Sequence, residues 1–205
     1  LKADLSRKLK DSQEANAFLQ KANGATFSIT QMDTKPAKRT PAAPFTTSTL
    51  QQEASRKLGF SVSRTMVVAQ RLYESGKITY MRTDSVNLSD FALDAAKNEI
   101  ARSYGERYSK TRQYTNKNKG AQEAHEAIRP TEMSAHQIEG ERDEQRLYEL
   151  IWKRTLASQM ADAELEKTTA TVGISTMDDV LLAKGEVVKF DGFLKVYAEG
   201  TDDED

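Results

Sequence analysis

The sequence has 205 residues, of which 38% are hydrophobic and 30% charged, with no cysteine and a formal net charge of −1. This length suffices for one large domain or two small ones, and the lack of cysteine excludes disulfides and thiolate metal sites. No apolar run approaches the roughly 20 residues that cross a bilayer, and no signal-peptide pattern opens the chain, so we expect a cytoplasmic protein.

The N-terminal segment predicts two strands, one helix and a connector. Residues 1–9 alternate weakly, and residues 26–32 are rich in β-branched and aromatic side chains, so we expect strands there. Residues 11–22 carry acidic side chains in their first turn and precede Gly24, a pattern typical of a helix. The stretch 34–44 contains three prolines, which forbid a regular helix, so we interpret it as an extended connector.

The middle of the chain is predicted to begin with a pair of helices. Ser48 and Gln51 fit a capping box for a first helix that ends at Gly59. After a short joint, a second helix is expected to run to about Ser75. Residues 77–82 have a strand-like pattern. Together these elements resemble a helix-turn-helix with an extended segment behind it.

Two more helices are expected before the chain returns to strands. Ser89 is the predicted cap of the first, with Leu88 and Leu93 placed to form a hydrophobic staple. Residues 104–122 are polar and basic with little periodicity, so we interpret them as a flexible loop. Residues 143–160 have apolar side chains near helical spacing and predict a long helix.

The C-terminal part predicts strands at 167–174, 180–184 and 187–196. Gly185 is expected to form a turn between the second and third of these strands. The pair Asp191-Gly192 is expected to form a turn within the segment 187–196, because Asp-Gly is a strong hairpin signal.

Strands at both ends with helices between them indicate an α+β fold, with one β domain built from both chain ends and a helical domain inserted into it. We place the first part of the β domain at 1–45, the helical domain at 46–160 and the second part of the β domain at 161–205. The residues that flank such an insertion must lie close in space.

Tyr80 and Arg82 lie in the most informative segment of the chain. On a strand, the two side chains would share a face. A guanidinium beside a phenol favours the phenolate and can also bind a phosphate, while Thr79, Thr83 and Ser85 add hydroxyl donors. A tyrosine nucleophile with a phosphate clamp is suited to attack a phosphodiester. The alternative is that the tyrosine only packs on its strand.

A second candidate cluster occupies residues 123–130. His125 can exchange a proton near neutral pH, and Arg129 can bind another phosphate. The alternative is a short surface helix ended by Pro130, with the histidine merely hydrogen-bonded. A zinc site is not expected, since His125 and His136 are far apart in sequence and no cysteine accompanies them.

Positive charge gathers in the first part of the chain. Residues 1–130 hold 22 Lys and Arg against 13 Asp and Glu, whereas residues 131–205 hold 8 against 18. A basic segment beside an acidic one indicates that the first part faces a polyanion, although an uneven surface is the plain alternative. The candidate phosphate contacts are Arg56, Lys57, Arg64, Arg71 and Arg129, of which Arg56 and Lys57 fit a solvated helix face equally well.

Three segments, taken in order and spacing, resemble the bacterial type IA DNA topoisomerases. They are residues 44–54 continuing through 66–74, then 78–85 around Tyr80, and 123–130. Residues 147–160 and 190–193 are also similar to that family, so the resemblance covers essentially the whole chain.

The resemblance implies a reaction and roles for three residues. In the family a tyrosine attacks one DNA strand and becomes linked to the 5′ phosphate, another strand passes through the gap, and the reverse attack reseals it without ATP. This relaxes negatively supercoiled DNA. Tyr80 matches that nucleophile, Arg82 matches the arginine that positions the scissile phosphate, and His125 matches a histidine proposed to support proton movement. Gln70 and Glu74 lie on family-like sequence near the site.

The resemblance also implies partners, a cofactor and an architecture. Single-stranded DNA is the expected partner, together with further domains of the same polypeptide, one of which binds Mg²⁺; no metal is expected in this chain. The helical domain would resemble a winged-helix module inserted into a β-rich arch, joined by the stretch 34–44. Because the chain starts at Leu1 without a methionine and ends in an acidic run, we expect a piece of a longer protein. Since the family's metal-binding domain is not part of this piece, we expect that it does not relax supercoiled DNA alone. A non-catalytic helix-turn-helix DNA-binding module and a scaffold are the alternatives.

Overall fold

The computed structural model describes residues 2–115 and 125–198. They divide into two compact units, one made of Leu1–Arg39 with Glu164–Phe190 and the other of Thr40–Ala163 with the segment that starts at Asp191. The combination of helices with an antiparallel sheet confirms the predicted α+β class. In the described part of the chain no helix is long and apolar enough to span a bilayer.

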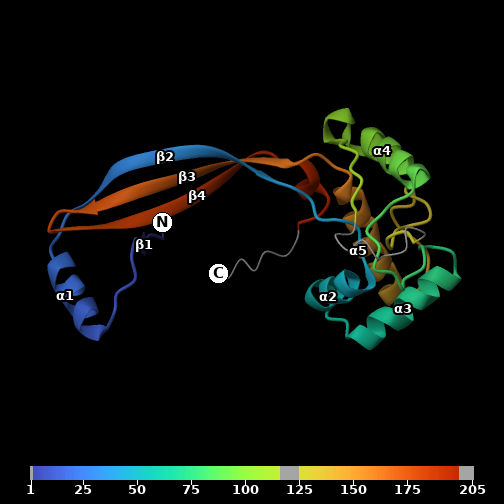
Figure 1. The fold of residues 1–205 in the computed structure, drawn as a ribbon, viewed down its shortest axis with the longest axis horizontal. Helices are drawn as coiled ribbons and strands as arrows, with labels where there is room; N and C mark the ends of the chain where they lie inside the picture. Colours follow the sequence, from blue (N-terminus) through green and yellow to red (C-terminus); the bar gives the residue numbers. More distant parts are fainter. Residues whose placement is uncertain (1, 116–124, 199–205) are drawn as a thin grey trace. The chain divides into compact units, whose positions relative to one another are not determined.

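The first unit is a four-stranded antiparallel sheet with one helix (Figure 1). Its strands lie in the order β1-β4-β3-β2. The helix α1 begins after Asp11, whose side chain accepts a hydrogen bond from the backbone of Glu14, as expected for an N-cap. The bounds are β1 Asp4–Leu5, α1 Ser12–Ala22, β2 Phe27–Arg39, β3 Ala163–Ile174 and β4 Met177–Phe190.

Three features of this sheet differ from the sequence expectation. Pro36 lies inside β2 rather than in a connector, which the sheet tolerates because β2 is an edge strand. Gly185 does not form a turn, since it pairs with Thr168 inside one continuous strand β4. The chain instead reverses between β3 and β4 at residues 175–176. Local composition could not reveal this pairing, which depends on strands far apart in the sequence.

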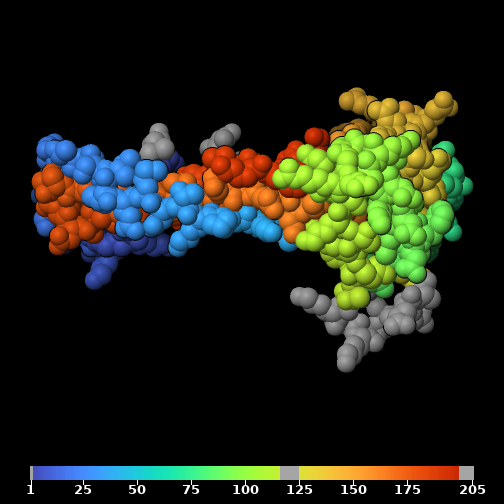
Figure 2. Space-filling view, turned by 90° about the horizontal axis from the view of Figure 1, so that it is seen from above, coloured from blue at the N-terminus to red at the C-terminus, as the bar shows by residue number. Residues whose placement is uncertain are grey.

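The sheet has little covered surface. Almost every residue of β2 is exposed, and most of β4 is exposed or half-buried. In Figure 2 the blue side chains of β2 and the orange and red side chains of β3 and β4 reach the surface. The sheet is therefore held mainly by its ladder and by pairs along it, such as Arg39 with Glu186 at 2.8 Å.

The second unit contains the other helices and the main hydrophobic core. Large side chains that are fully buried include Phe45, Leu50, Leu72, Ile151 and Leu156. They come from the connector before α2 and from three different helices, so the core joins segments that are distant in sequence. The bounds are α2 Thr47–Leu58, α3 Val62–Glu74, α4 Asp90–Tyr104, a 3₁₀ turn η1 Glu106–Tyr108, α5 Arg142–Ser158 and a 3₁₀ turn η2 Gly192–Lys195.

The helix ends follow local chemistry closely. Gly59 ends α2 in the left-handed conformation at φ 69°, and Ser89 caps α4, both as predicted. Leu88 and Leu93 are buried in the same small cluster, as expected for a staple. The capping box of α2 is made by Thr46 and Thr49, so the prediction of Ser48 and Gln51 is wrong.

The segment after β4 belongs to the helical unit. Asp191 is the N-cap of η2 and Gly192 is its first residue, so the pair does not form a hairpin turn. Phe193 donates a backbone hydrogen bond to the carbonyl of Ala161 at 2.9 Å. Phe193 and Tyr197 are buried in the helical core. The contacts therefore place the borders of this unit at Thr40, Ala163 and Asp191, compared with the 46–160 expected from the sequence.

The expected loop 104–122 and the start of the second candidate cluster are described only in part. Residues 106–108 of the loop form η1, and its part from 116 onward lies outside the described residues. Residues 123–124 of the cluster also lie outside them, so the structure describes this cluster from His125.

Candidate active site

Tyr80 lies in an irregular segment, with bends at Lys77, Thr79 and Met81, that is not part of a sheet. The predicted strand 77–82 forms only an isolated bridge, between Ile78 and Pro130. Tyr80 is 46% exposed, Arg82 is exposed, and Met81 between them is fully buried. The exposed side chains of Tyr80 and Arg82 thus lie on either side of the buried Met81 in the sequence. The two side chains do not share the face of a strand, as the sequence predicted, because no strand is formed here.

Thr79 ties the tyrosine segment to the segment that follows His125. Its backbone N–H donates to the carbonyl of Arg129 at 2.9 Å, and its hydroxyl accepts from the N–H of Arg129 at 2.9 Å. The same hydroxyl donates to the carbonyl of Ala127 at 2.7 Å. Because these bonds fix the backbone on either side, the structure brings the Tyr80 and His125 segments together, with both side chains exposed.

The other side of the segment is held by the first turn of α2. The hydroxyl of Thr47 donates to the carbonyl of Met81 at 2.7 Å, and its N–H donates to the carbonyl of Thr83 at 2.9 Å. The hydroxyl of Thr83 accepts from the N–H of Ser85 at 3.0 Å. Ser85 is buried and its hydroxyl accepts from the N–H of Asn87 at 3.1 Å. These two hydroxyls therefore support the loop, and Ser85 offers no exposed group to a ligand.

Arg129 is buried and held by a carboxylate. Its guanidinium donates to Glu126 at 2.7 Å and to the carbonyl of Pro130 at 2.9 Å. Glu126 also accepts from the N–H of Ser89, the cap of α4, at 2.6 Å. Burial opposes the charge of Glu126, but the hydrogen bonds from Arg129 and Ser89 outweigh it and lower the pKa of this carboxyl below its usual value. The pair thereby fixes the short segment that follows His125.

Arg64 and Arg71 lie on α3 with acidic partners near the start of α5. Arg64 pairs with Asp143 at 2.6 Å and stacks over the ring of Phe60, with its guanidinium carbon 4.4 Å from the centroid. Arg71 pairs with Glu141 at 2.9 Å. Both arginine side chains remain about half exposed, so each has a structural partner and an accessible face.

Tyr73 also lies at the candidate site, although no sequence motif indicates a role for it. Its ring meets that of Tyr80 edge-on, with 5.2 Å between centroids and 65° between planes. Tyr73 is on the last turn of α3 and is 41% exposed. Its position seven residues before Tyr80 gives no periodic signal, because the chain bends at Gly76 between them.

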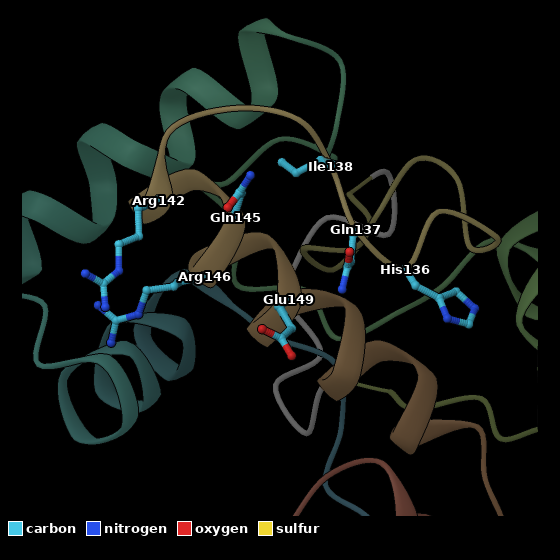
Figure 3. A pocket seen from close by; sticks show the side chains of 7 residues that line it. All are labelled: His136, Gln137, Ile138, Arg142, Gln145, Arg146 and Glu149. Atoms are coloured by element: carbon cyan, nitrogen blue, oxygen red, sulfur yellow. The ribbon is translucent and has the colours of Figure 1, made fainter.

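A separate surface cavity of about 220 Å³ borders α5 (Figure 3). Arg142 and Arg146 give it positive charge, and Glu149 lies on the same wall. Residues 139–149 contain five acidic and two basic residues, so the surroundings do not favour a phosphate. The lining residues are His136, Gln137, Ile138, Arg142, Gln145, Arg146 and Glu149.

Metal ligands are not assembled in the part of the chain that the structure describes. Within residues 2–115 and 125–198 no three His, Cys, Asp or Glu side chains come together in a way that could hold an ion. The described residues therefore do not fit a Mg²⁺ centre.

Comparison with known proteins defines the class. A family model described as DNA topoisomerase matches residues 1–205. The chain is 52% identical over 195 residues to DNA topoisomerase 1 of Zymomonas mobilis, covering 94% of this chain and 16% of that protein. It is 50% identical over 200 residues to the Synechocystis protein of the same name, covering 95% of this chain and 22% of that one.

A solved structure agrees with these sequence matches. The full-length topoisomerase I of Thermotoga maritima superposes with a TM-score of 0.81 at 36% identity, over 97% of this chain and 34% of that one. The chain belongs to the bacterial type IA DNA topoisomerases, as the sequence motifs predicted. It corresponds to part of a DNA topoisomerase I and spans about a fifth of the length of the curated relatives it matches.

Proposed function

We propose that this chain carries the nucleophile with which a type IA topoisomerase cuts and rejoins one strand of DNA. The observation that supports it most is the exposed phenol of Tyr80, followed two residues later by the exposed Arg82 around the buried Met81. An exposed tyrosine whose backbone is fixed on both sides can approach a phosphodiester without rearrangement of the core.

The reaction conserves the phosphate ester energy. The phenol of Tyr80 gives up its proton as its oxygen attacks phosphorus, and a 5′-phosphotyrosine bond forms. The bond to the 3′ oxygen breaks, and that oxygen takes up a proton to become a free 3′ hydroxyl. After strand passage the 3′ hydroxyl attacks the phosphotyrosine and restores both the DNA and the phenol. Because one ester replaces another, no ATP is consumed when negatively supercoiled DNA relaxes.

Arg82 and His125 serve this step in different ways. The guanidinium of Arg82 holds the scissile phosphate and stabilises the charge that gathers on its oxygens in the transition state. The imidazole of His125 moves a proton near the phenol. Both side chains are exposed and sit on segments that Thr79 joins, which supports their joint action.

The remaining expected contacts divide into two groups. Arg64 and Arg71 keep half-exposed guanidinium groups and can bind a single strand of DNA through its phosphates. Thr79, Thr83, Ser85 and Arg129 contribute mainly by holding the loops that carry Tyr80 and His125, since their polar groups are engaged within the chain.

The complete reaction needs more than this segment. We propose that Mg²⁺ is bound by another domain of the full-length cytoplasmic enzyme, that the sheet unit acts as its arch, and that the helical unit is the winged-helix-like module that carries Tyr80. On this view the chain by itself does not relax supercoiled DNA. Mg²⁺-dependent relaxation by the purified chain would overturn this part of the proposal.

The decisive experiment replaces Tyr80 by Phe in the full-length enzyme. A single-stranded oligonucleotide labelled at its 3′ end is incubated with enzyme and Mg²⁺, denatured and separated by size. The unchanged enzyme is expected to retain the label covalently, and Tyr80→Phe is expected to retain none while still binding the strand. Covalent retention by the variant would disprove the assignment of the nucleophile. A non-catalytic helix-turn-helix module would instead show no covalent product with either protein and would prefer duplex DNA.

A further inference from the structure

The position of the Tyr80 backbone is fixed, but its ring is not held by the core. Thr79 is bonded to Ala127 and Arg129, and Met81 is fully buried with its carbonyl bonded to Thr47. The ring of Tyr80, in contrast, is half exposed, and in the described part of the chain no hydrogen bond to its phenol oxygen is found. A separate contact is needed to select one direction for the phenol.

Tyr73 provides that contact from a rigid support. It precedes the end of α3, whose Val68, Ala69 and Leu72 are buried in the main core. The carbonyl of Tyr73 accepts from the N–H of Gly76 at 2.8 Å, which fixes the turn between the two tyrosines. The end of α3, which carries Tyr73, is therefore held in place by contacts that do not involve Tyr80.

The geometry of the pair is that of a favourable aromatic contact. The rings lie 5.2 Å apart at 65°, so the edge of one meets the face of the other. Such a contact favours one ring orientation over free rotation by roughly two- to tenfold. Because Tyr73 is itself 41% exposed, the contact adds little to the stability of the core.

We propose that Tyr73 is a positioning residue for Tyr80, holding its ring edge-on so that the phenol oxygen points toward the scissile phosphate. This inference rests on the proposed role of Tyr80 as the nucleophile. Tyr73 does not touch the reacting atoms and acts only through the orientation of its neighbour. The contact requires the aromatic ring and not the hydroxyl of Tyr73, so Phe is expected to replace it and Leu is not.

The contact between the two rings can be tested on the chain itself. Its seven tyrosines are labelled with 3-fluorotyrosine, and the Tyr80 resonance is assigned with Tyr80→Phe. Tyr73→Leu is expected to shift that resonance and Tyr73→Phe to leave it near its original position. Phe91→Leu is the matched control, because Phe91 is an aromatic residue that is 74% exposed on α4. An unmoved resonance in Tyr73→Leu would overturn the proposal.

The catalytic consequence is measured in the full-length enzyme. At saturating single-stranded DNA, Tyr73→Leu is expected to form the covalent complex about two- to tenfold more slowly, with strand affinity within about twofold of the original. Tyr73→Phe is expected to restore the rate. If Tyr73→Leu cleaves at the original rate while Tyr80→Phe does not cleave, only the positioning role fails. If Tyr80→Phe itself still cleaves, the proposed function fails with it.

Discussion

Thr79 and Arg129 exchange two hydrogen bonds, each 2.9 Å long, although they are 50 residues apart in the sequence. The N–H of Thr79 donates to the carbonyl of Arg129, and the N–H of Arg129 donates to the hydroxyl of Thr79. The residue before the proposed nucleophile is thus bound directly to the segment that carries the proposed proton-transfer histidine.

Removal of the Thr79 hydroxyl is expected to loosen this junction. Thr79→Val keeps the shape but leaves the N–H of Arg129 and the carbonyl of Ala127 without a partner, so unfolding free energy should fall by about 1–3 kcal/mol. For a chain of this length that corresponds to roughly 2–4 °C in melting temperature per kcal/mol. Thr79→Ser retains the hydroxyl and is the control. Equal melting temperatures for Thr79→Val and the unchanged chain would contradict this assignment.

The stability supplied by Glu126 is expected to depend on pH. Burial raises its pKa, but hydrogen bonds from Arg129 and Ser89 dominate and leave the folded-state pKa below the ordinary glutamate value of 4.5. A lowered folded pKa means that the stabilisation is complete above the unfolded pKa and disappears as the pH falls through the folded value. Glu126→Gln should therefore destabilise the chain at pH 7 and make little difference under strongly acidic conditions.

Urea unfolding at a series of pH values measures that difference. At each pH the free energy of unfolding of Glu126→Gln is subtracted from that of the unchanged chain. The contributions of the other carboxylates cancel in this difference. In an Arg129→Met background the same Glu126→Gln change should show a weaker pH dependence, because the main hydrogen-bond donor is gone. A difference that is constant across pH would show that Glu126 does not contribute through its charge.

Replacement of Gly59 or of Gly192 by alanine is expected to destabilise the chain by different amounts. Gly59 ends α2 at φ 69° with open space where a Cβ would be added, so Gly59→Ala should cost about 1 kcal/mol from backbone strain alone. Gly192 combines φ 51° with the carbonyl oxygens of Asp162 and Ala161 at 2.4 and 2.5 Å from an added Cβ. Gly192→Ala should cost on the order of 3 kcal/mol, because steric overlap adds to strain.

Thermal unfolding of the two variants compares these costs directly. Gly185→Ala is the control, since it lies in β4 with open space around it and without a left-handed backbone. The expected order of melting temperatures is Gly185→Ala above Gly59→Ala above Gly192→Ala. A Gly192→Ala chain that melts with the control would mean that η2 does not pack tightly on the helical unit.

Features set by neighbouring residues could be predicted from the sequence. Gly59 and Ser89 mark helix ends because their chemistry acts within one turn of backbone. The helices, and the presence of strands toward both chain ends, could also be predicted, since apolar spacing differs between helices and strands, but the strand expected at 77–82 is not formed. The strand boundaries predicted near Pro36 and Gly185 are wrong. Whether a sheet accommodates a proline or a glycine depends on which strand is at the edge and which residue lies opposite, and local sequence does not show either.

The proposed site was predictable only in part. Tyr80, Arg82 and His125 were found through family motifs, and the structure leaves all three exposed. The strand expected around Tyr80 is missing because the segment pairs with Pro130 at one point and is otherwise held by threonine hydroxyls. The engagement of Arg129 by Glu126 and the contact of Tyr73 with Tyr80 depend on tertiary packing, so spacing alone could not reveal them.

The hydrogen bond from Phe193 to Ala161 has a practical consequence for dissecting the molecule. It holds the two points at which the chain leaves and re-enters the helical unit close together, so a brief synthetic turn could replace the excursion 164–190 without stretching either end. A minimal protein made in this way, from Thr40 to Ala163 and onward from Asp191, would isolate the tyrosine-bearing half for spectroscopy and for screening of small-molecule ligands.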